Sequence, residues 1–400
     1  YTRKKIAAIV TAMFPSALGS HGGLIIPKFL KGFPTIHGLV DPKVDIVSMY
    51  VDQPHWTNMA QELAEEHNIM IYNSIRAALT LKPQNRPGHW TPKDDKHLGD
   101  LAVDGVLIIA EHGDYAANEQ GRHLYPRRFF FEQVCGVFAT SGRSVPVFND
   151  KHLAYNWTDA LWMYQRAREL NVPLMSGSSI PVGHREPELE HPMETPIQEA
   201  ISVGYIHPFA LGLDSYGFHG LEALQCMIER RKGGETGISA VQCLEGDDVW
   251  KAATAGVWSR ELAEAAESRV TSKKQGDMQN NCKEPIVFLI EHTDGMRSAN
   301  LLLPGHLEGF GYAALVNGQI QSTGFNLPEG MDRHFSYQGL NVQEMFVTGR
   351  PQYPVERTLL VSGALDALME SRYQGNARIE TPHLNIAYTS YKTRLIRPVT

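Results

Sequence analysis

Val103-Asp-Gly-Val-Leu-Ile-Ile-Ala-Glu-His-Gly-Asp114 is the stretch that decides the fold. Residues 103–110 are apolar apart from Asp104, which is typical of a strand in a parallel sheet that is buried on both faces. Ionisable residues follow at once, beginning with Glu111. Ligands of parallel sheets bind outside the carboxyl ends of the strands. The stretch therefore predicts a buried strand that leads into a functional site.

Other strands and helices alternate around this stretch. The pattern predicts strands over 5–10, 44–51, 145–149 and 172–175, and helices over 24–32, 57–67, 129–140 and 158–170. Strands that alternate with helices form a parallel sheet covered on both faces. We therefore predict an α/β fold whose first part, residues 1–155, is a Rossmann-like domain of the nucleotide-binding type.

The pattern changes after about residue 176. Strand-like runs now follow one another, over 198–208, 238–244, 286–291, 299–303 and 312–316, with fewer helices between them, over 220–230, 248–267 and 354–373. Such an order predicts an α+β domain with a mixed or antiparallel open sheet. We assign it residues 156–400, with a closing helix near 354–373.

The composition excludes several classes of protein. The chain has 400 residues, 42% of them hydrophobic, and a formal net charge of −7. The negative charge argues against nucleic acid or an anionic membrane as the partner, and no apolar run reaches the roughly 18 residues of a membrane span. The four cysteines form no C-x-x-C pair, which argues against a disulfide scaffold. We expect a small-molecule partner, and 17 histidines favour an enzyme.

The compartment stays open at this point. The chain begins at Tyr1 rather than at a methionine. We expect a soluble protein, either of the bacterial cytoplasm or exported after cleavage of a signal.

Three motifs resemble those of one family. Val145-Pro-Val-Phe-Asn-Asp-Lys-His-Leu-Ala154, followed by a helix and Asn171-Val-Pro-Leu-Met175, resembles the glucose–fructose oxidoreductase and inositol dehydrogenase family (Gfo/Idh/MocA), which has Glu-Lys-Pro after the strand. Ser215-Tyr-Gly-Phe-His-Gly-Leu-Glu222 is similar to that family's D-x-G-x-H-x-x-D. The strand at 104–110 and the segment 348–373 match as well, so the resemblance covers most of the chain.

The resemblance implies an activity. In that family a nicotinamide cofactor, NAD(P), binds the first domain, and a sugar or cyclitol hydroxyl is oxidised at the domain junction. The resemblance gives Lys151 and His219 as catalytic residues. Loss of a hydride from a hydroxyl carbon requires removal of the hydroxyl proton, which a histidine can accept, and a lysine can stabilise the alkoxide. The family also pairs through the open face of the second sheet, so we expect a homo-oligomer.

The first turn departs from the usual dinucleotide fingerprint. After the first strand we expect G-x-G-x-x-G, which lets the backbone approach a pyrophosphate. The chain instead has Thr11-Ala-Met-Phe-Pro-Ser-Ala-Leu-Gly-Ser-His-Gly-Gly23, with late glycines and a proline that removes a backbone donor. Thr11, Ala12, Met13 and Asp52 remain the cofactor-binding candidates, and binding of NAD(P) stays open.

Further candidates follow strands of the predicted sheet. Glu111 and His112 are candidate catalytic residues, because ionisable groups at a strand's carboxyl end are costly without a function. The candidate substrate-binding residues are Asp114, His152, His184, Arg185 and Tyr216. A divalent metal is conceivable on the set Glu111, His112, Asp114, His123, His152 and His219. No H-x-H or H-x-x-x-H spacing supports such a site, so we assign no metal ligand.

Three functions remain open from the sequence. The first is the sugar or cyclitol oxidoreductase. The second is an acid/base enzyme on carbohydrates without net redox change, which cleaves a glycoside or eliminates a group, with a retained NAD or a divalent metal. The third is a non-catalytic sugar-binding protein. Loss of the glycine turn suits the second and third, whereas Lys151 and His219 favour the first two.

Overall fold

The computed structural model describes residues 2–15, 19–82, 100–207, 212–326 and 333–399. A six-stranded sheet forms the first half of the fold, in the order β5-β4-β1-β6-β7-β8, and every pairing in it is parallel. Its strands are β1 (Lys4–Val10), β4 (Val44–Val51), β5 (Met70–Tyr72), β6 (Gly105–Ile109), β7 (Val147–Asp150) and β8 (Leu174–Gly177). The order reverses between β1 and β6, which is where ligands of such sheets bind.

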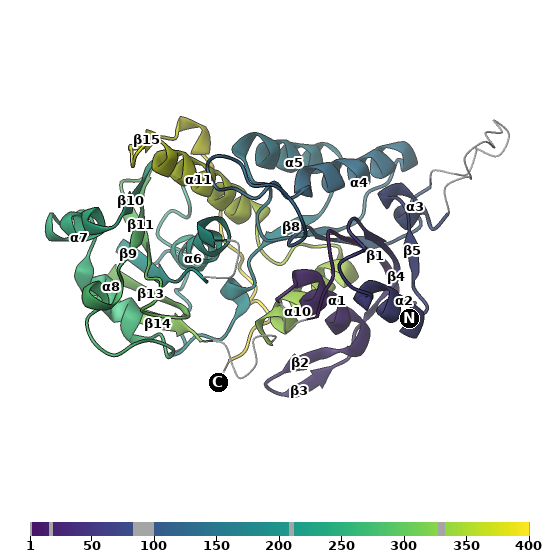
Figure 1. The fold of residues 1–400 in the computed structure, drawn as a ribbon, viewed down its shortest axis with the longest axis horizontal. Coiled ribbons are helices and arrows are strands. Elements are labelled where there is room, and N and C mark those ends of the chain that lie inside the picture. The colour runs from purple at the N-terminus through teal and green to yellow at the C-terminus, as the bar shows by residue number, and fades with distance from the viewer. Residues whose placement is uncertain (1, 16–18, 83–99, 208–211, 327–332, 400) are drawn as a thin grey trace.

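Helices cover both faces of this sheet (Figure 1). One face packs on α1 (His21–Lys31), α2 (Met59–Glu66) and α10 (Arg333–Thr348), and the other packs on α3 (Ile75–Thr80), α4 (Arg127–Ser141) and α5 (Trp157–Glu169). Alternate residues of β1 enter the two cores, Ile6 and Ala8 on one side and Ala7 and Ile9 on the other. A short hairpin, β2 (Phe33–Thr35) and β3 (Gly38–Val40), follows α1.

A seven-stranded mixed sheet forms the second half, in the order β14-β13-β9-β12-β11-β10-β15. The strands are β9 (Ile197–Gly204), β10 (Ile238–Glu245), β11 (Ile286–His292), β12 (Arg297–Leu302), β13 (Phe310–Val316), β14 (Gln319–Phe325) and β15 (Ile379–Glu380). Only β9 and β12 pair in parallel. Together, the two sheets confirm the predicted fold class.

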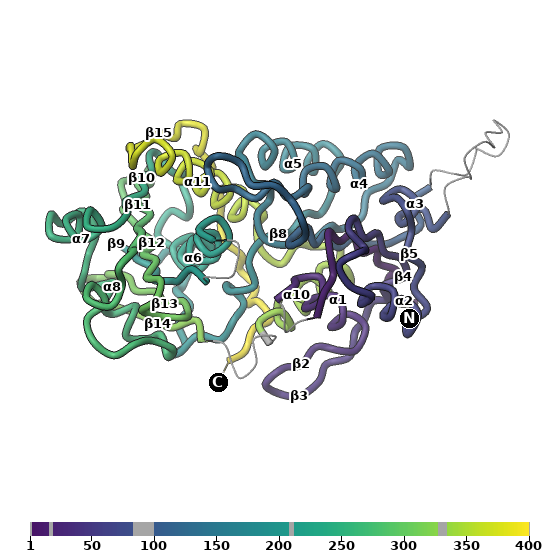
Figure 2. Tube along the Cα trace, in the orientation of Figure 1, coloured from purple at the N-terminus to yellow at the C-terminus, as the bar shows by residue number. Residues whose placement is uncertain are grey.

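Helices lie against both faces of the second sheet as well. The inner face packs on α6 (Gly212–Ile228) and α11 (Val355–Tyr373). The outer face packs on α7 (Asp247–Thr254), α8 (Arg260–Ser268) and α9 (Met278–Asn281). Phe288 of β11 contributes to the inner core and Val287 to the outer one, as alternation along a strand requires. In Figure 2, α6 lies between the two sheets.

Several elements differ from those that the sequence predicted. The first sheet takes in β8, which follows the boundary predicted at residue 155. The helix predicted over 248–267 is divided into α7 and α8, because Gly256 ends the first with a left-handed backbone (φ 71°) and the Ser259 side chain caps the second. Helix α6 starts before the predicted 220–230, so His219 lies within it. Strand β14 and helix α10 were not predicted.

Candidate active site

The strands β6 and β7 bring two predicted residues to one edge of the first sheet. The two strands are neighbours with Ile108 opposite Asn149, so the residues that follow them meet at the carboxyl edge. Glu111 follows β6, and Lys151 follows β7. Lys151 has a left-handed backbone (φ 62°), an uncommon conformation for a residue with a side chain. The sheet thus positions Glu111 and Lys151 as the sequence predicted.

Lys151 is buried and ion-paired. Its Nζ donates a hydrogen bond of 2.9 Å to Oε1 of Glu111 and another to the hydroxyl of Ser215 on α6. Arg127, at the start of α4, contacts the other oxygen of Glu111. The ammonium group therefore joins the first sheet to the helix that carries His219.

The charges of Lys151 and Arg127 determine whether the Glu111 carboxyl is ionised. Burial raises the pKa of its carboxyl, but the positive charges of Lys151 and Arg127 outweigh burial and hold the pKa well below its usual range. Glu111 is thus a carboxylate between two cations, an arrangement in which each buried charge has an opposite charge in contact with it.

His219 lies on α6, one helical turn after Ser215. The ring is half-buried, and its Nδ1 is 2.6 Å from the hydroxyl oxygen of Ser178, which follows β8. Burial lowers the pKa of His219 well below its usual value, and the positive charge of Lys151 lowers it further. The imidazole is therefore neutral at physiological pH and able to accept a proton.

Two residues that the sequence analysis did not select also lie at this edge. Nδ1 of His21, the first residue of α1, is 2.5 Å from Oδ2 of Asp150. The ring of His112 lies 5.3 Å from that of His21, and its Nδ1 accepts the backbone N–H of His21 at 3.4 Å. Burial, with the charge of His21, lowers the pKa of His112 to about 3. The position of His21 among the late glycines, and of Asp150 beside Lys151, could have indicated both.

His152 belongs to a contact between the two halves of the fold. Its ring stacks on Phe218 at 4.2 Å, and its Nε2 is 3.2 Å from Oδ1 of Asp214 on α6. Arg122 donates to the same carboxylate at 2.8 Å and to Asp366 of α11 at 3.1 Å. These groups are buried apart from Asp366, and they fix α6 against the first sheet. His123 belongs to the set of residues considered for a metal. It contacts this group through its backbone N–H, which donates to the Asp214 carboxylate at 3.0 Å.

The other predicted substrate-binding residues are scattered. Asp114 is exposed, and its backbone bonds to the Gln53 side chain. Arg185 is buried and donates to the carbonyls of Leu189 and Pro181, so its guanidinium holds a loop.

Two other members of that set have different surroundings. Nε2 of His184 is buried with no hydrogen-bond partner among the residues that the structure describes. Tyr216 lies on α6, with its ring 6.0 Å from that of His219 and 4.9 Å from that of Tyr205. Among the four predicted substrate-binding residues other than His152, Tyr216 is the one whose ring lies near that of His219.

The cofactor candidates line the neighbouring part of the same edge. Thr11 follows β1, and its hydroxyl donates to the carbonyl of Glu111 at 2.9 Å. Ala12 and Met13 are buried beside it. A Cβ on Gly22 would lie 2.9 Å from the Ala12 carbonyl oxygen, so the late glycines let α1 approach this turn closely.

Asp52 follows β4, where a ribose hydroxyl of a dinucleotide would need an acceptor. Its two carboxylate oxygens accept hydrogen bonds of 2.7 Å from the hydroxyls of Tyr50 and Tyr115, and each oxygen retains a further lone pair. Asp52 and the close approach of α1 fit a dinucleotide. The longer turn with Pro15 differs from the fingerprint on the pyrophosphate side.

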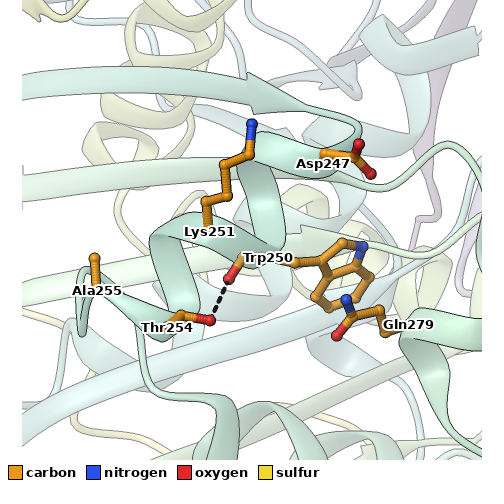
Figure 3. Close-up of a pocket in the computed structure, with 6 residues that line it drawn as sticks. All are labelled: Asp247, Trp250, Lys251, Thr254, Ala255 and Gln279. Carbon is orange, nitrogen blue, oxygen red and sulfur yellow. Dashed lines mark hydrogen bonds between the residues drawn. The ribbon is translucent and has the colours of Figure 1, made fainter.

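Two further observations concern metals and cavities. Among the described residues, no group of three or more His, Cys, Asp or Glu side chains is arranged to hold a metal ion. An open cavity of about 500 Å³ lies on α7, lined by Trp250, Lys251 and Gln279 among others (Figure 3). None of the residues at the carboxyl edge lines it. In the part of the chain that the structure covers, no helix has both the length and the apolar character that a membrane span needs.

Comparison with known proteins identifies the fold. No protein-family model matches the chain, and no curated protein matches it significantly. Solved structures do match. GenD2 from gentamicin A biosynthesis, in complex with NAD, is 15% identical with a TM-score of 0.57 over 95% of this chain and 97% of that one. The chain has the Gfo/Idh/MocA fold.

Two inositol dehydrogenases have the same fold. The myo-inositol 2-dehydrogenase of Lactobacillus plantarum is 11% identical, with a TM-score of 0.54 over 95% of this chain and 99% of that one. The scyllo-inositol dehydrogenase of Lactobacillus casei, with bound NAD(H) and scyllo-inositol, is 10% identical, with a TM-score of 0.56 over the same shares. The Gfo/Idh/MocA resemblance that the motifs carried is thus confirmed at the level of the fold.

Proposed function

We propose that the protein oxidises a hydroxyl group of a sugar or cyclitol, with a nicotinamide cofactor as the hydride acceptor. The observation that carries the proposal is the placement of Lys151 and Ser215 in direct contact, with neutral His219 one turn along the same helix. The structural neighbours support the proposal, because two of them are named as inositol dehydrogenases and GenD2 was solved in complex with NAD.

Each side chain would have its own role in the reaction. His219 accepts the hydroxyl proton at Nε2, since its Nδ1 is engaged by Ser178. Lys151 donates a hydrogen bond to the substrate oxygen and stabilises the negative charge that develops on it. Glu111 orients Lys151 through their ion pair, and Ser215 fixes the ammonium group from α6.

The cofactor has a defined place in this proposal. When bound, NAD(P) supplies the acceptor for the hydride. Asp52 would hold a ribose hydroxyl, and Thr11, Ala12 and Met13 would line the turn beside it. Asp52 is also the residue that would distinguish NAD from NADP, since a carboxylate accepts a ribose hydroxyl and repels a phosphate.

The geometry favours oxidation over acid/base chemistry without redox change. The second function needs Glu111 as a proton donor or acceptor, but its carboxyl is ionised and engaged by two cations. A carboxylate in that state is a poor acid, and its lone pairs are directed at Lys151 and Arg127. Glu111 therefore serves better as a residue that positions Lys151.

The test is a screen of NAD and NADP with neutral hexoses, inositols and their oxidised forms, followed by the absorbance of reduced nicotinamide. With an active pair, Lys151→Met should lower kcat by about 10²-fold or more, because the ammonium group is lost and most of the stem volume is kept. His219→Asn should lower kcat similarly, since asparagine keeps a group near the Nδ1 position and removes Nε2.

The matched control is Lys251→Met, the same change at an exposed lysine of α7. It should leave kcat unchanged. Full turnover in both Lys151→Met and His219→Asn would refute the assignment, provided that circular dichroism shows both variants folded.

A further inference from the structure

A buried carboxyl group lies behind His219. Glu222 stands three residues after His219 on α6, and its side chain is fully buried. Its Oε1 is 2.8 Å from the hydroxyl of Thr358 on α11, and its Oε2 accepts the backbone N–H of Ser178 at 3.4 Å. Gly177 leaves room for this approach, because a Cβ there would lie 2.8 Å from Oε2.

The single hydrogen of the Thr358 hydroxyl bears on whether the Glu222 carboxyl is protonated. The Thr358 hydroxyl lies 2.9 Å from the carbonyl oxygen of Ser176 as well as 2.8 Å from Oε1 of Glu222. A hydroxyl has one hydrogen, and a carbonyl can only accept. One hydrogen cannot serve both the Ser176 carbonyl and a Glu222 carboxylate. Protonation of Glu222 satisfies both oxygens, because the acid can then donate to Thr358 while Thr358 donates to Ser176.

The charges around Glu222 also favour the protonated carboxyl. Arg357 is the nearby cation, but its guanidinium is bidentate to Glu229, with hydrogen bonds of 2.6 and 2.8 Å. Burial raises the pKa of Glu222 to about 7, against the opposing charge of Arg357. The titratable and charged groups that face it are Arg357, Glu229, Cys226 and Tyr353.

Ser178 connects this acid to His219. Its backbone N–H bonds to Glu222, and its hydroxyl oxygen lies 2.6 Å from Nδ1 of His219. The same oxygen accepts the N–H of Ile180 at 3.1 Å, which fixes the serine rotamer. The turn at Ser178 thus contacts both the Glu222 carboxyl and Nδ1 of the His219 imidazole.

We propose that Ser178 and Glu222 are positioning residues for His219, in which the neutral acid holds the 177–178 turn and the serine hydroxyl holds Nδ1. The proposal rests on the proposed role of His219 as a base. When Glu222 loses its proton, Ser176 and the carboxylate compete for the one hydrogen of Thr358, and the carboxylate attracts the N–H of Ser178 more strongly. Ionisation of Glu222 therefore disturbs the turn under His219.

The first experiment needs no substrate. Nitrogen-15 NMR of histidine-labelled protein, with the His219 signals assigned by loss in His219→Asn, reports which ring nitrogen carries the proton. We expect one tautomer in the wild-type protein, with hydrogen on Nδ1. Ser178→Ala should give exchange between tautomers, and Ser178→Thr, which keeps the hydroxyl, should restore the single one. Unchanged His219 signals in Ser178→Ala would overturn the proposal.

The second experiment uses Glu222→Gln. The amide can donate to Thr358 and accept from Ser178 as the acid does, but it does not titrate. In the wild-type protein we expect the His219 signals, and kcat on an active pair, to change as the pH rises through about 7. Glu222→Gln should keep the low-pH signals and kcat within about twofold and remove the change. A change that persists in Glu222→Gln would overturn the role of Glu222.

Glu229→Gln is the companion variant, because it makes the same substitution just beyond the end of α6, at the carboxylate that pairs with Arg357. It should lower stability and release Arg357, whose charge then lowers the pKa of Glu222, so the change of the His219 signals should move to lower pH but not disappear. A wild-type tautomer with hydrogen on Nε2 that Ser178→Ala disturbs would support the positioning role and contradict His219 as the base. Failure of the positioning proposal can thus be distinguished from failure of the proposed role of His219 as a base.

Discussion

Glu111 and Glu222 are two buried carboxyl groups near the proposed catalytic residues: Glu111 contacts Lys151, and Glu222 contacts Ser178, which in turn contacts His219. Glu111 follows a strand of the first sheet and lies between two cations. Glu222 lies on α6 and has no cation to itself, since Arg357 is engaged by Glu229. Burial acts on both in the same direction, yet the pKa of Glu111 falls well below its usual range and that of Glu222 rises to about 7.

The difference teaches that burial alone does not decide the charge of a carboxyl group. Burial disfavours the charged form, and an adjacent opposite charge favours it. At Glu111 two cations outweigh burial, and at Glu222 the nearest cation is already paired. One glutamate can therefore stabilise a buried ammonium group while the other holds a proton, and each can be tested by the same substitution.

The largest expected effect is that of Glu111→Gln. The substitution leaves Lys151 and Arg127 buried without their carboxylate, and breaking such a pair costs about 3–5 kcal/mol. We expect the free energy of unfolding, measured by urea denaturation, to fall by that amount. A loss under about 1 kcal/mol would show that the two cations do not depend on Glu111.

A double-mutant cycle controls for a general packing defect. Lys151→Met removes one of the two cations, so Glu111→Gln should cost less in that background than in the wild type. Equal costs in both backgrounds would contradict the ion pair.

The second effect is a pH dependence of stability at Glu222. Its pKa is raised from 4.5 to about 7 in the folded state, so its contribution is fully present below about pH 4.5 and is lost as the pH rises through about 7. The shift corresponds to about 3 kcal/mol. Relative to Glu222→Gln, the wild-type protein should therefore lose stability between these values. Parallel curves for the two proteins, from urea titrations across this pH range, would contradict a protonated Glu222.

The third prediction concerns the carboxyl edge of the first sheet, where Glu111 lies, and tests whether this edge binds the cofactor. NAD at a hundred times its dissociation constant should stabilise the protein by about 2.7 kcal/mol, seen as a rise in Tm. Asp52→Asn should weaken the rise, whereas Glu222→Gln should leave it intact. If neither NAD nor NADP raises Tm at millimolar concentration, the lengthened turn with Pro15 does not bind the cofactor.

The smallest effect is expected at His112, beside Glu111. Burial holds its pKa near 3, so the ring carries no charge at neutral pH. Its backbone is left-handed (φ 71°), a conformation that asparagine tolerates better than histidine. His112→Asn should change the free energy of unfolding by less than about 1 kcal/mol and leave its pH dependence above pH 5 unaltered. A loss comparable to that of Glu111→Gln would make His112 part of the charged cluster.

The sequence predicted the residues that strand ends position, but not those that tertiary contacts supply. Glu111 and Lys151 follow apolar strands, so the rule for parallel sheets located both. Ser178, Arg127 and His21 lie far from them in the chain, and only the packing of the helices shows their contacts with the site.

Helix α10 was missed for a related reason. Polar residues occupy its buried face and hide the apolar periodicity that predicts a helix. The Gln338 amide nitrogen donates to the carbonyl of Gly177, and that of Asn341 donates to the carbonyl of Ile396, so each amide nitrogen has a backbone acceptor. A buried polar residue with a backbone partner costs little, and such pairings cannot be predicted from the sequence.

The helices α7, α8 and α9 on the outer face of the second sheet bear on quaternary structure. The resemblance implied pairing of subunits through that face, but side chains such as Trp258 and Leu262 already bury it within one chain. A second copy could reach the sheet only by displacing these helices, which would expose their apolar side chains to water. If the protein forms a homo-oligomer, its subunits should therefore meet through helix surfaces or loops, in a smaller and more polar contact than a sheet-to-sheet interface.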